Sequence, residues 1–201
     1  MARHHKPIPK NLSHGNWIEV TKLEAARRQI DSAIFLYFND HDFVSVHTLG
    51  SAAVAIVDTL LKAKGLPDTV GDLANIRPEF KESVRAMLTE DANFFKHGSK
   101  DPDQTLPFKP ESNELMLMRG CDGYFRIHGS TTPSMFIFIL WMRIWMSQVF
   151  ISVFPLEKIA ELQAQYPRSV AQRYFADFWR LKDHPEFGFP EGFPRPEGPI
   201  Q

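Results

Sequence analysis

The sequence contains very little cysteine and almost no excess of either charge. Its one cysteine, Cys121, excludes an internal disulfide, which fits a reducing compartment. The 23 basic and 24 acidic residues give a formal net charge of −1. Proteins held to phosphate backbones usually carry a basic excess or a basic face. Nucleic acid therefore stays open as a partner, but the net charge does not support it.

The common sequence signatures of nucleotide binding and hydrolysis are also missing. There is no Gly-x-Gly-x-x-Gly loop, no phosphate-binding Gly-x4-Gly-Lys-Ser/Thr loop and no Gly-x-Ser-x-Gly elbow. No Glu is followed by His three residues later, which excludes the usual di-iron helix pairs, and His-Glu-x-x-His is absent. The sequence therefore names no cofactor, and we predict no metal site.

No apolar segment follows the basic N-terminal residues, so we expect no secretory signal and a cytoplasmic protein. One apolar run, Met135 to Phe154, is long enough to span a bilayer. Arg143 lies near its centre, where a charge costs roughly 2.5–3.5 kcal/mol on insertion scales. We therefore expect a helix buried in the protein rather than in a membrane.

Large apolar rings are abundant, with 17 Phe and 4 Trp against 4 Tyr, and they indicate a thick core or a sizeable partner interface. Apolar residues recur at three- to four-residue steps along most of the chain, while strand signals are nearly absent. The sequence predicts an all-α, single-domain bundle of five to seven helices. The expected helices cover residues 17–39, 43–64, 78–97, 111–125, 133–154, 156–166 and 167–181.

The two ends of the chain differ from this pattern. Residues 1–16 are predicted to be an N-terminal arm, residues 17–183 the helical bundle, and residues 184–201 an extended or disordered tail. The tail holds five prolines and three glycines, which exclude a helix or a central strand. Its three phenylalanines leave two alternatives, a floppy terminus or a Pro/Gly-rich arm that docks on this chain or on a twin subunit.

Polar residues within apolar helices are the candidates for function. His47 is followed by Ser51 four residues later and by Asp58 eleven residues later, which places all three along one stripe of a helix. His47 could serve as a binding or acid–base group, with Asp58 as a second binding residue. The alternative is a histidine that is hydrogen-bonded where two helices meet.

A second group lies at the end of the third expected helix. Glu90, Asn93 and His97 share one helix face, and Asp101 follows closely enough to fold back on the imidazole. A carboxylate beside His97 would raise its pKa and fix its tautomer, as a general acid or base needs. A histidine at a helix C-terminus is also favoured by the helix dipole alone. The candidate catalytic residues are Asn93, Lys96, His97 and Asp101, and the candidate binding residues are His47, Asp58, Glu90 and Asp103.

Two further residues are expected to be structural. Glu114 and Arg143 each need a partner if they are buried, and an internal ion pair between them is the economical arrangement. Cys121 has no histidine close in sequence, so a buried and inert thiol is expected.

The long helix rich in small residues, followed by a helix that ends in Asn93-Phe94-Phe95-Lys96-His97, resembles HEPN-like helical domains of prokaryotic nucleotide-binding and RNA-cleaving proteins. It is also similar to small bacterial helical proteins with the same Asn-Phe-Phe-Lys-His ending. The resemblance implies a dimer whose polar residues meet across the subunit interface. The nuclease members carry an Arg followed four to six residues later by His, and within residues 18–130, which the resemblance covers, no pair has that spacing.

These patterns favour a homodimeric binding or regulatory module. The alternative is a HEPN-like hydrolase or ribonuclease that uses His97 as its acid–base group. The sequence does not decide between an enzyme and a binding protein.

Overall fold

In the computed structural model of this chain, the structure describes residues 18–39, 42–69, 76–84, 103, 105–151, 154–168, 180 and 196–197. Within these residues the fold is all-α, without a strand, which confirms the predicted fold class. The elements in chain order are α1 (Lys22–Asn39), α2 (Phe43–Ala63), the short 3₁₀ helix η2 (Pro78–Phe80), α4 (Ser112–His128), α5 (Pro133–Trp145) and α6 (Leu156–Gln165).

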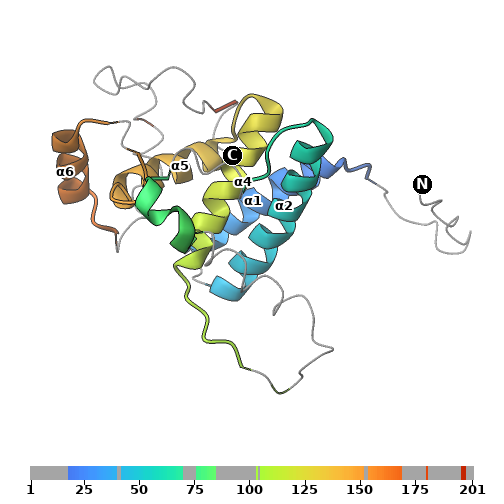
Figure 1. Ribbon diagram of the computed structural model, residues 1–201, viewed down its shortest axis with the longest axis horizontal. Helices are drawn as coiled ribbons and strands as arrows, with labels where there is room; N and C mark the ends of the chain where they lie inside the picture. Colours follow the sequence, from blue (N-terminus) through green and yellow to red (C-terminus); the bar gives the residue numbers. More distant parts are fainter. Residues whose placement is uncertain are drawn as a thin grey trace, which may run out of the picture.

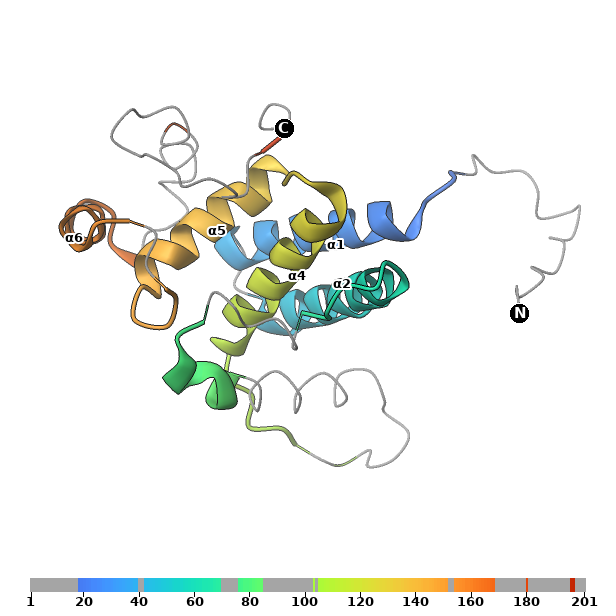
Figure 2. The ribbon, with the colours of Figure 1, turned by 45° about the horizontal axis from the view of Figure 1, so that its top comes forward.

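The first two helices lie side by side, and α4 packs across both of them (Figures 1 and 2). Local signals set their starts. The Thr21 hydroxyl accepts a hydrogen bond from the Glu24 amide at the start of α1, and the Asp42 carboxylate accepts one from the Ser45 amide at the start of α2. Both contacts satisfy backbone N–H groups that a helix N-terminus leaves without an intrahelical partner.

Glycine on α4 allows this helix to approach α2 closely. A Cβ atom at Gly123 would lie 2.2 Å from Val57 Cγ1 and 2.7 Å from Thr69 Cγ2. Ordinary carbon–carbon contacts are about 3.5–4.0 Å, so any larger residue would push the two helices apart. The spacing between α2 and α4 therefore depends on the missing side chain at this position.

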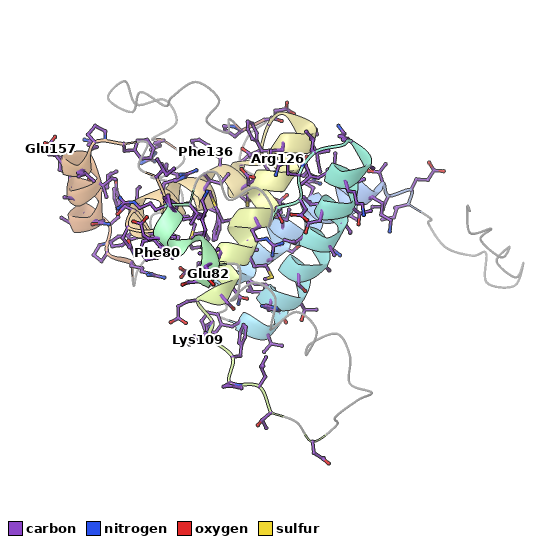
Figure 3. The ribbon with its side chains drawn as sticks, viewed as in Figure 1. Phe80, Glu82, Lys109, Arg126, Phe136 and Glu157 are labelled. Carbon is purple, nitrogen blue, oxygen red and sulfur yellow. The ribbon has the colours of Figure 1, made fainter. Side chains whose placement is uncertain are left out.

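The fifth helix forms the centre of the core. Every residue from Met135 to Ile144 is buried, and all of them except Arg143 are apolar, as expected for a helix that other elements surround. Phe138 and Trp141 of α5 pack against Tyr37 and Phe38 of α1, with ring centroids 5.7–6.1 Å apart between the two helices. Figure 3 shows Phe136 inside the bundle, in contrast to residues at its outer edges such as Glu157.

The prediction that this helix continues to Phe154 was wrong, because α5 ends at Trp145. Beyond it, the backbone turns through Met146 and Val149, and Phe150 forms an isolated antiparallel bridge with Ile76. Arg77, which comes earlier in the chain, binds the turn that follows α5. Its backbone amide donates a hydrogen bond to the Val149 carbonyl (2.9 Å). Its side chain donates to the carbonyls of Phe150 (3.2 Å) and Ser147 (3.3 Å). These long-range bonds replace the helical ones that the apolar run alone would have favoured.

The buried α5 has 13 residues and is about 20 Å long, shorter than the ~30 Å hydrocarbon layer. Among the described residues, only α2 is long and apolar enough to cross a membrane, judged by its length and composition. The core helix of a globular protein passes the same test, so this finding is weak evidence for a membrane span.

Candidate functional site

The predicted catalytic residues lie outside the residues that the structure describes. This applies to Asn93, Lys96, His97 and Asp101, and also to the predicted binding residue Glu90. Asp103 is described and is exposed to solvent. The hypothesis of an acid–base group at His97 therefore stays a prediction.

His47 is buried between α2 and α4. Its Nδ1 lies 3.0 Å from Asn113 Oδ1, and the Asn113 amide nitrogen donates to the Phe43 carbonyl at 2.9 Å. The Asn113 oxygen is thus the acceptor, so Nδ1 of His47 carries the proton. The ring also packs edge-on against Phe108, with centroids 5.2 Å apart. These contacts give His47 a role in joining two helices.

Asp58 lies toward the other end of α2, and both of its carboxylate oxygens have partners within the protein. One of its oxygens accepts hydrogen bonds from the amide and the hydroxyl of Thr69, both at 2.8 Å. The other oxygen faces Arg119 Nη2 at 3.4 Å, and Arg119 Nε donates to the Thr69 hydroxyl. This cluster fastens the loop after α2 to α4. Since Asp58 lies about 16 Å along the helix axis from His47, the two residues do not converge on one site.

The predicted ion pair between Glu114 and Arg143 was also wrong. The Glu114 carboxylate accepts hydrogen bonds from the Tyr37 hydroxyl (2.6 Å) and from Arg168. Arg143 instead donates to the Ile151 carbonyl at 3.1 Å and lies over the Phe150 ring. Burial lowers the pKa of Arg143 to about 10. The buried charges of Glu114 and Arg143 therefore have separate partners and do not contact each other.

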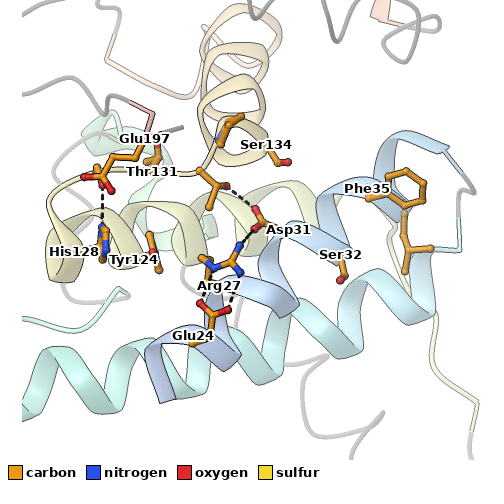
Figure 4. Close-up of a pocket in the computed structure, with 14 residues that line it drawn as sticks. Glu24, Arg27, Asp31, Ser32, Phe35, Tyr124, His128, Thr131, Ser134 and Glu197 are labelled. Atoms are coloured by element: carbon orange, nitrogen blue, oxygen red, sulfur yellow. Dashed lines mark hydrogen bonds and ion pairs between the residues drawn. The ribbon is translucent and has the colours of Figure 1, made fainter. Parts of the chain in front are cut away.

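The described residues form an open cleft of about 760 Å³ where α1, the end of α4 and the start of α5 meet (Figure 4). One wall is a face of α1, from Glu24 to Leu36. The other wall combines Tyr124 and His128 of α4 with the turn and first residues of α5, Ser130 to Ser134, and with Glu197 near the C-terminus. The volume lies within the ~300–1,000 Å³ range of small-molecule sites.

The turn between α4 and α5 positions the second wall. Gly129 ends α4 in the left-handed conformation (φ 90°), which a residue without a Cβ adopts easily. Thr132 then begins α5, where its hydroxyl accepts a hydrogen bond from the Met135 amide, and Pro133 occupies the first helical position. The same hydroxyl donates to Asp31 Oδ1 at 2.5 Å, which ties the turn to α1.

Arg27 lies at the centre of the cleft between two carboxylates of its own helix. Its Nε and Nη2 atoms each donate to Glu24 at 2.7 Å, and its Nη1 atom donates to Asp31 Oδ2 at 2.9 Å. Hydrogen bonds from Arg27 and Arg28 lower the pKa of Glu24 to about 2. The pKa of Asp31 is instead raised, because burial outweighs its hydrogen bonds with Thr132 and Arg27.

The far end of the cleft contains a stacked pair, Tyr124 and His128, with ring centroids 5.1 Å apart and an interplanar angle of 20°. His128 Nδ1 lies 2.9 Å from the Ser130 hydroxyl. This distance would suit a nucleophile and its base, but Ser130 is buried and follows His128 by only two residues. The bond therefore fixes the turn after α4, and we assign it no catalytic role.

The third carboxylate of the cleft comes from the C-terminal region. Pro196 forms a parallel bridge with Thr131, and the Glu197 amide donates to the Thr131 carbonyl at 2.8 Å. Burial raises the pKa of Tyr124, and the negative charge of Glu197 adds to this effect. No group of three or more His, Cys, Asp or Glu side chains suited to a metal ion occurs in the described part of the chain.

Sequence reasoning missed this cleft. One signal was available, because Glu24, Arg27 and Asp31 follow each other at three- and four-residue steps and so share a face of one helix. Nothing in the sequence pointed from that face to Tyr124, His128 or Glu197. Comparison with protein-family models, with curated proteins and with solved structures finds no match for this chain.

Proposed function

We propose that this chain is a binding module that holds a small organic molecule in the cleft between α1, α4 and α5. The cleft itself carries the proposal, since it combines about 760 Å³ of open volume with hydroxyls, carboxylates and an exposed aromatic ring. Small-molecule sites typically combine such a concave shape with a few fixed polar groups. The polar groups here are held by hydrogen bonds before any ligand arrives, which lowers the entropy lost on binding.

A blocking substitution tests this proposal. Ser32 lines the cleft and is exposed on α1, so Ser32→Trp fills the cleft without entering the core. Thr59→Trp is the matched control, because Thr59 is exposed on α2 and is not a lining residue. Ligand-detected NMR with a panel of small polar amines, alcohols and carboxylates should find binding that Ser32→Trp abolishes and Thr59→Trp keeps. If no compound in the panel follows that pattern, the proposal is wrong.

The homodimer is a separate proposal. Because α5 is enclosed within one chain, the subunit contact would have to use other surfaces, such as the exposed side chains of Ile18, Val44 and Leu156. Light scattering at micromolar concentration tests it, and the mass of a single chain would contradict it.

A further inference from the structure

The cleft contains more negatively charged side chains than positively charged ones. Glu24, Asp31 and Glu197 carry negative charge, and Arg27 is the one Lys or Arg among the described lining residues. Arg28, outside the lining, also pairs with Glu24 at 2.7 Å, so the surplus is a single negative charge. Arg27 already donates from three nitrogens to two carboxylates, so its charge is matched within the protein. An anionic ligand would meet a surplus of negative charge and an occupied guanidinium. A cationic ligand would be attracted by the same surplus of negative charge.

Asp31 is placed to accept a further hydrogen bond. Each of its oxygens accepts one described bond, from Thr132 on one side and from Arg27 on the other. A carboxylate offers about four acceptor positions, so two are left on this side chain. The carboxylate is only partly exposed and lies in the wall of the cleft, which places a bound N–H donor in partly desolvated surroundings.

An apolar surface lies one helical turn from this carboxylate. Phe35 follows Asp31 by four residues on the same face of α1, and its side chain lines the cleft while 62% of the residue is exposed. Leu36, half-buried, lies next to it. Figure 4 shows Phe35 at one end of the cleft, with Asp31 and Arg27 in the middle. A ligand that reaches both parts needs a polar end and an apolar portion.

From this arrangement we infer that the ligand of the cleft is an organic amine, with its ammonium group at Asp31 and its apolar portion against Phe35. The inference rests on the proposed binding function. The ammonium donates to the vacant acceptor positions of Asp31, and Glu197 adds negative charge from the opposite wall. The raised pKa of Asp31 agrees with this assignment. Burial disfavours the ionised form of this carboxylate, and a bound cation would favour it again.

The test uses three probes of similar size that share a phenyl ring and differ in the polar end: phenethylamine, a cation, 2-phenylethanol, which is neutral, and phenylacetate, an anion. Binding to the full chain is measured by NMR titration at neutral pH, in parallel with Ser32→Trp and Thr59→Trp. For a probe this small we expect a dissociation constant of ~1 mM for phenethylamine. The alcohol and the carboxylate should bind at least tenfold more weakly.

Two substitutions locate the amine. Asp31→Asn should weaken phenethylamine at least tenfold and leave the alcohol unchanged. Glu197→Gln, at an exposed position, should weaken the amine two- to fivefold even if the first variant proves unstable. Equal or tighter binding of the alcohol or the carboxylate in the cleft would overturn the amine inference and leave the binding function standing. If none of the three probes binds, the amine inference fails. If the wider panel fails as well, the binding function fails with it.

Discussion

Gly123→Ala should destabilise the protein strongly, because α2 and α4 meet at this glycine. The new Cβ atom would lie 2.2 Å from Val57 Cγ1, at least ~1.3 Å closer than an ordinary carbon contact. Neither neighbour can move easily. Val57 is fully buried and β-branched, and Thr69 is fixed by its two hydrogen bonds to Asp58.

The magnitude follows from two opposing effects. Overpacking of a well-packed core costs about 1–3 kcal/mol, and the immobile neighbours place Gly123→Ala at the upper end. Replacing glycine by alanine within a helix stabilises that helix by about 1 kcal/mol. The net loss in the free energy of unfolding should be about 2 kcal/mol.

Gly50→Ala is the matched control. Its new Cβ atom would lie 2.6 Å from Met116 Cε, the end of a flexible side chain that can swing aside. We expect a change near zero or a stabilisation of up to about 1 kcal/mol. Urea denaturation of both variants should place their midpoints about 1 M apart or more. Equal midpoints would show that α2 and α4 do not approach each other as described.

Four further predictions concern single side chains. Cys121 is buried and its pKa is raised by burial, so a thiol reagent should modify it only when urea unfolds the protein. Glu24→Gln should cost under about 1 kcal/mol at pH 7. Because the folded pKa of Glu24, about 2, lies below its usual value of 4.5, this difference should shrink as the pH falls from 4.5 to 2; a constant difference would contradict the ion pairs. Glu114→Gln should cost about 1–3 kcal/mol, and the exposed Glu111→Gln almost nothing, as measured by urea denaturation. If the hydrolase alternative holds, the wild type cleaves RNA and His97→Ala does not, while both unfold alike; an inactive wild type would exclude it.

Several helix bounds were predictable because local signals set them. The expected ranges 43–64 and 156–166 agree to within one residue with α2 and α6. The turn between α4 and α5 was expected at Gly129 and Thr132, and both residues hold the predicted positions. Apolar periodicity and capping residues act over a few positions, so they are visible in the sequence itself.

The end of α5 and the partners of Glu114 were not predictable in the same way. Arg77 and Ile76 stop the helix from a position about 70 residues earlier in the chain. Glu114 bonds to Tyr37, 77 residues away. An apolar run shows that a segment is buried, but it does not show where another segment will compete for its backbone hydrogen bonds.

The candidate site was missed for the same reason. The stripe of Glu24, Arg27 and Asp31 was visible, but such a stripe is usually a solvated helix face with its own ion pairs. It becomes the wall of a cleft because Thr132 bonds to Asp31 across 101 residues. His47 and Asp58, which stood out as polar residues in an apolar helix, bond to α4 and the loop after α2 instead.

The central claim is that an organic amine binds in the cleft between α1, α4 and α5. An amide-resolved NMR titration of the full chain with phenethylamine tests it most directly, since every backbone N–H near the ligand reports its own shift. We predict that the largest changes occur at Arg27, Asp31, Thr131, Thr132 and Ser134, and that Ser32→Trp removes them. Changes that are absent, or that are as large on the outer face of α2 as in the cleft, would contradict the account.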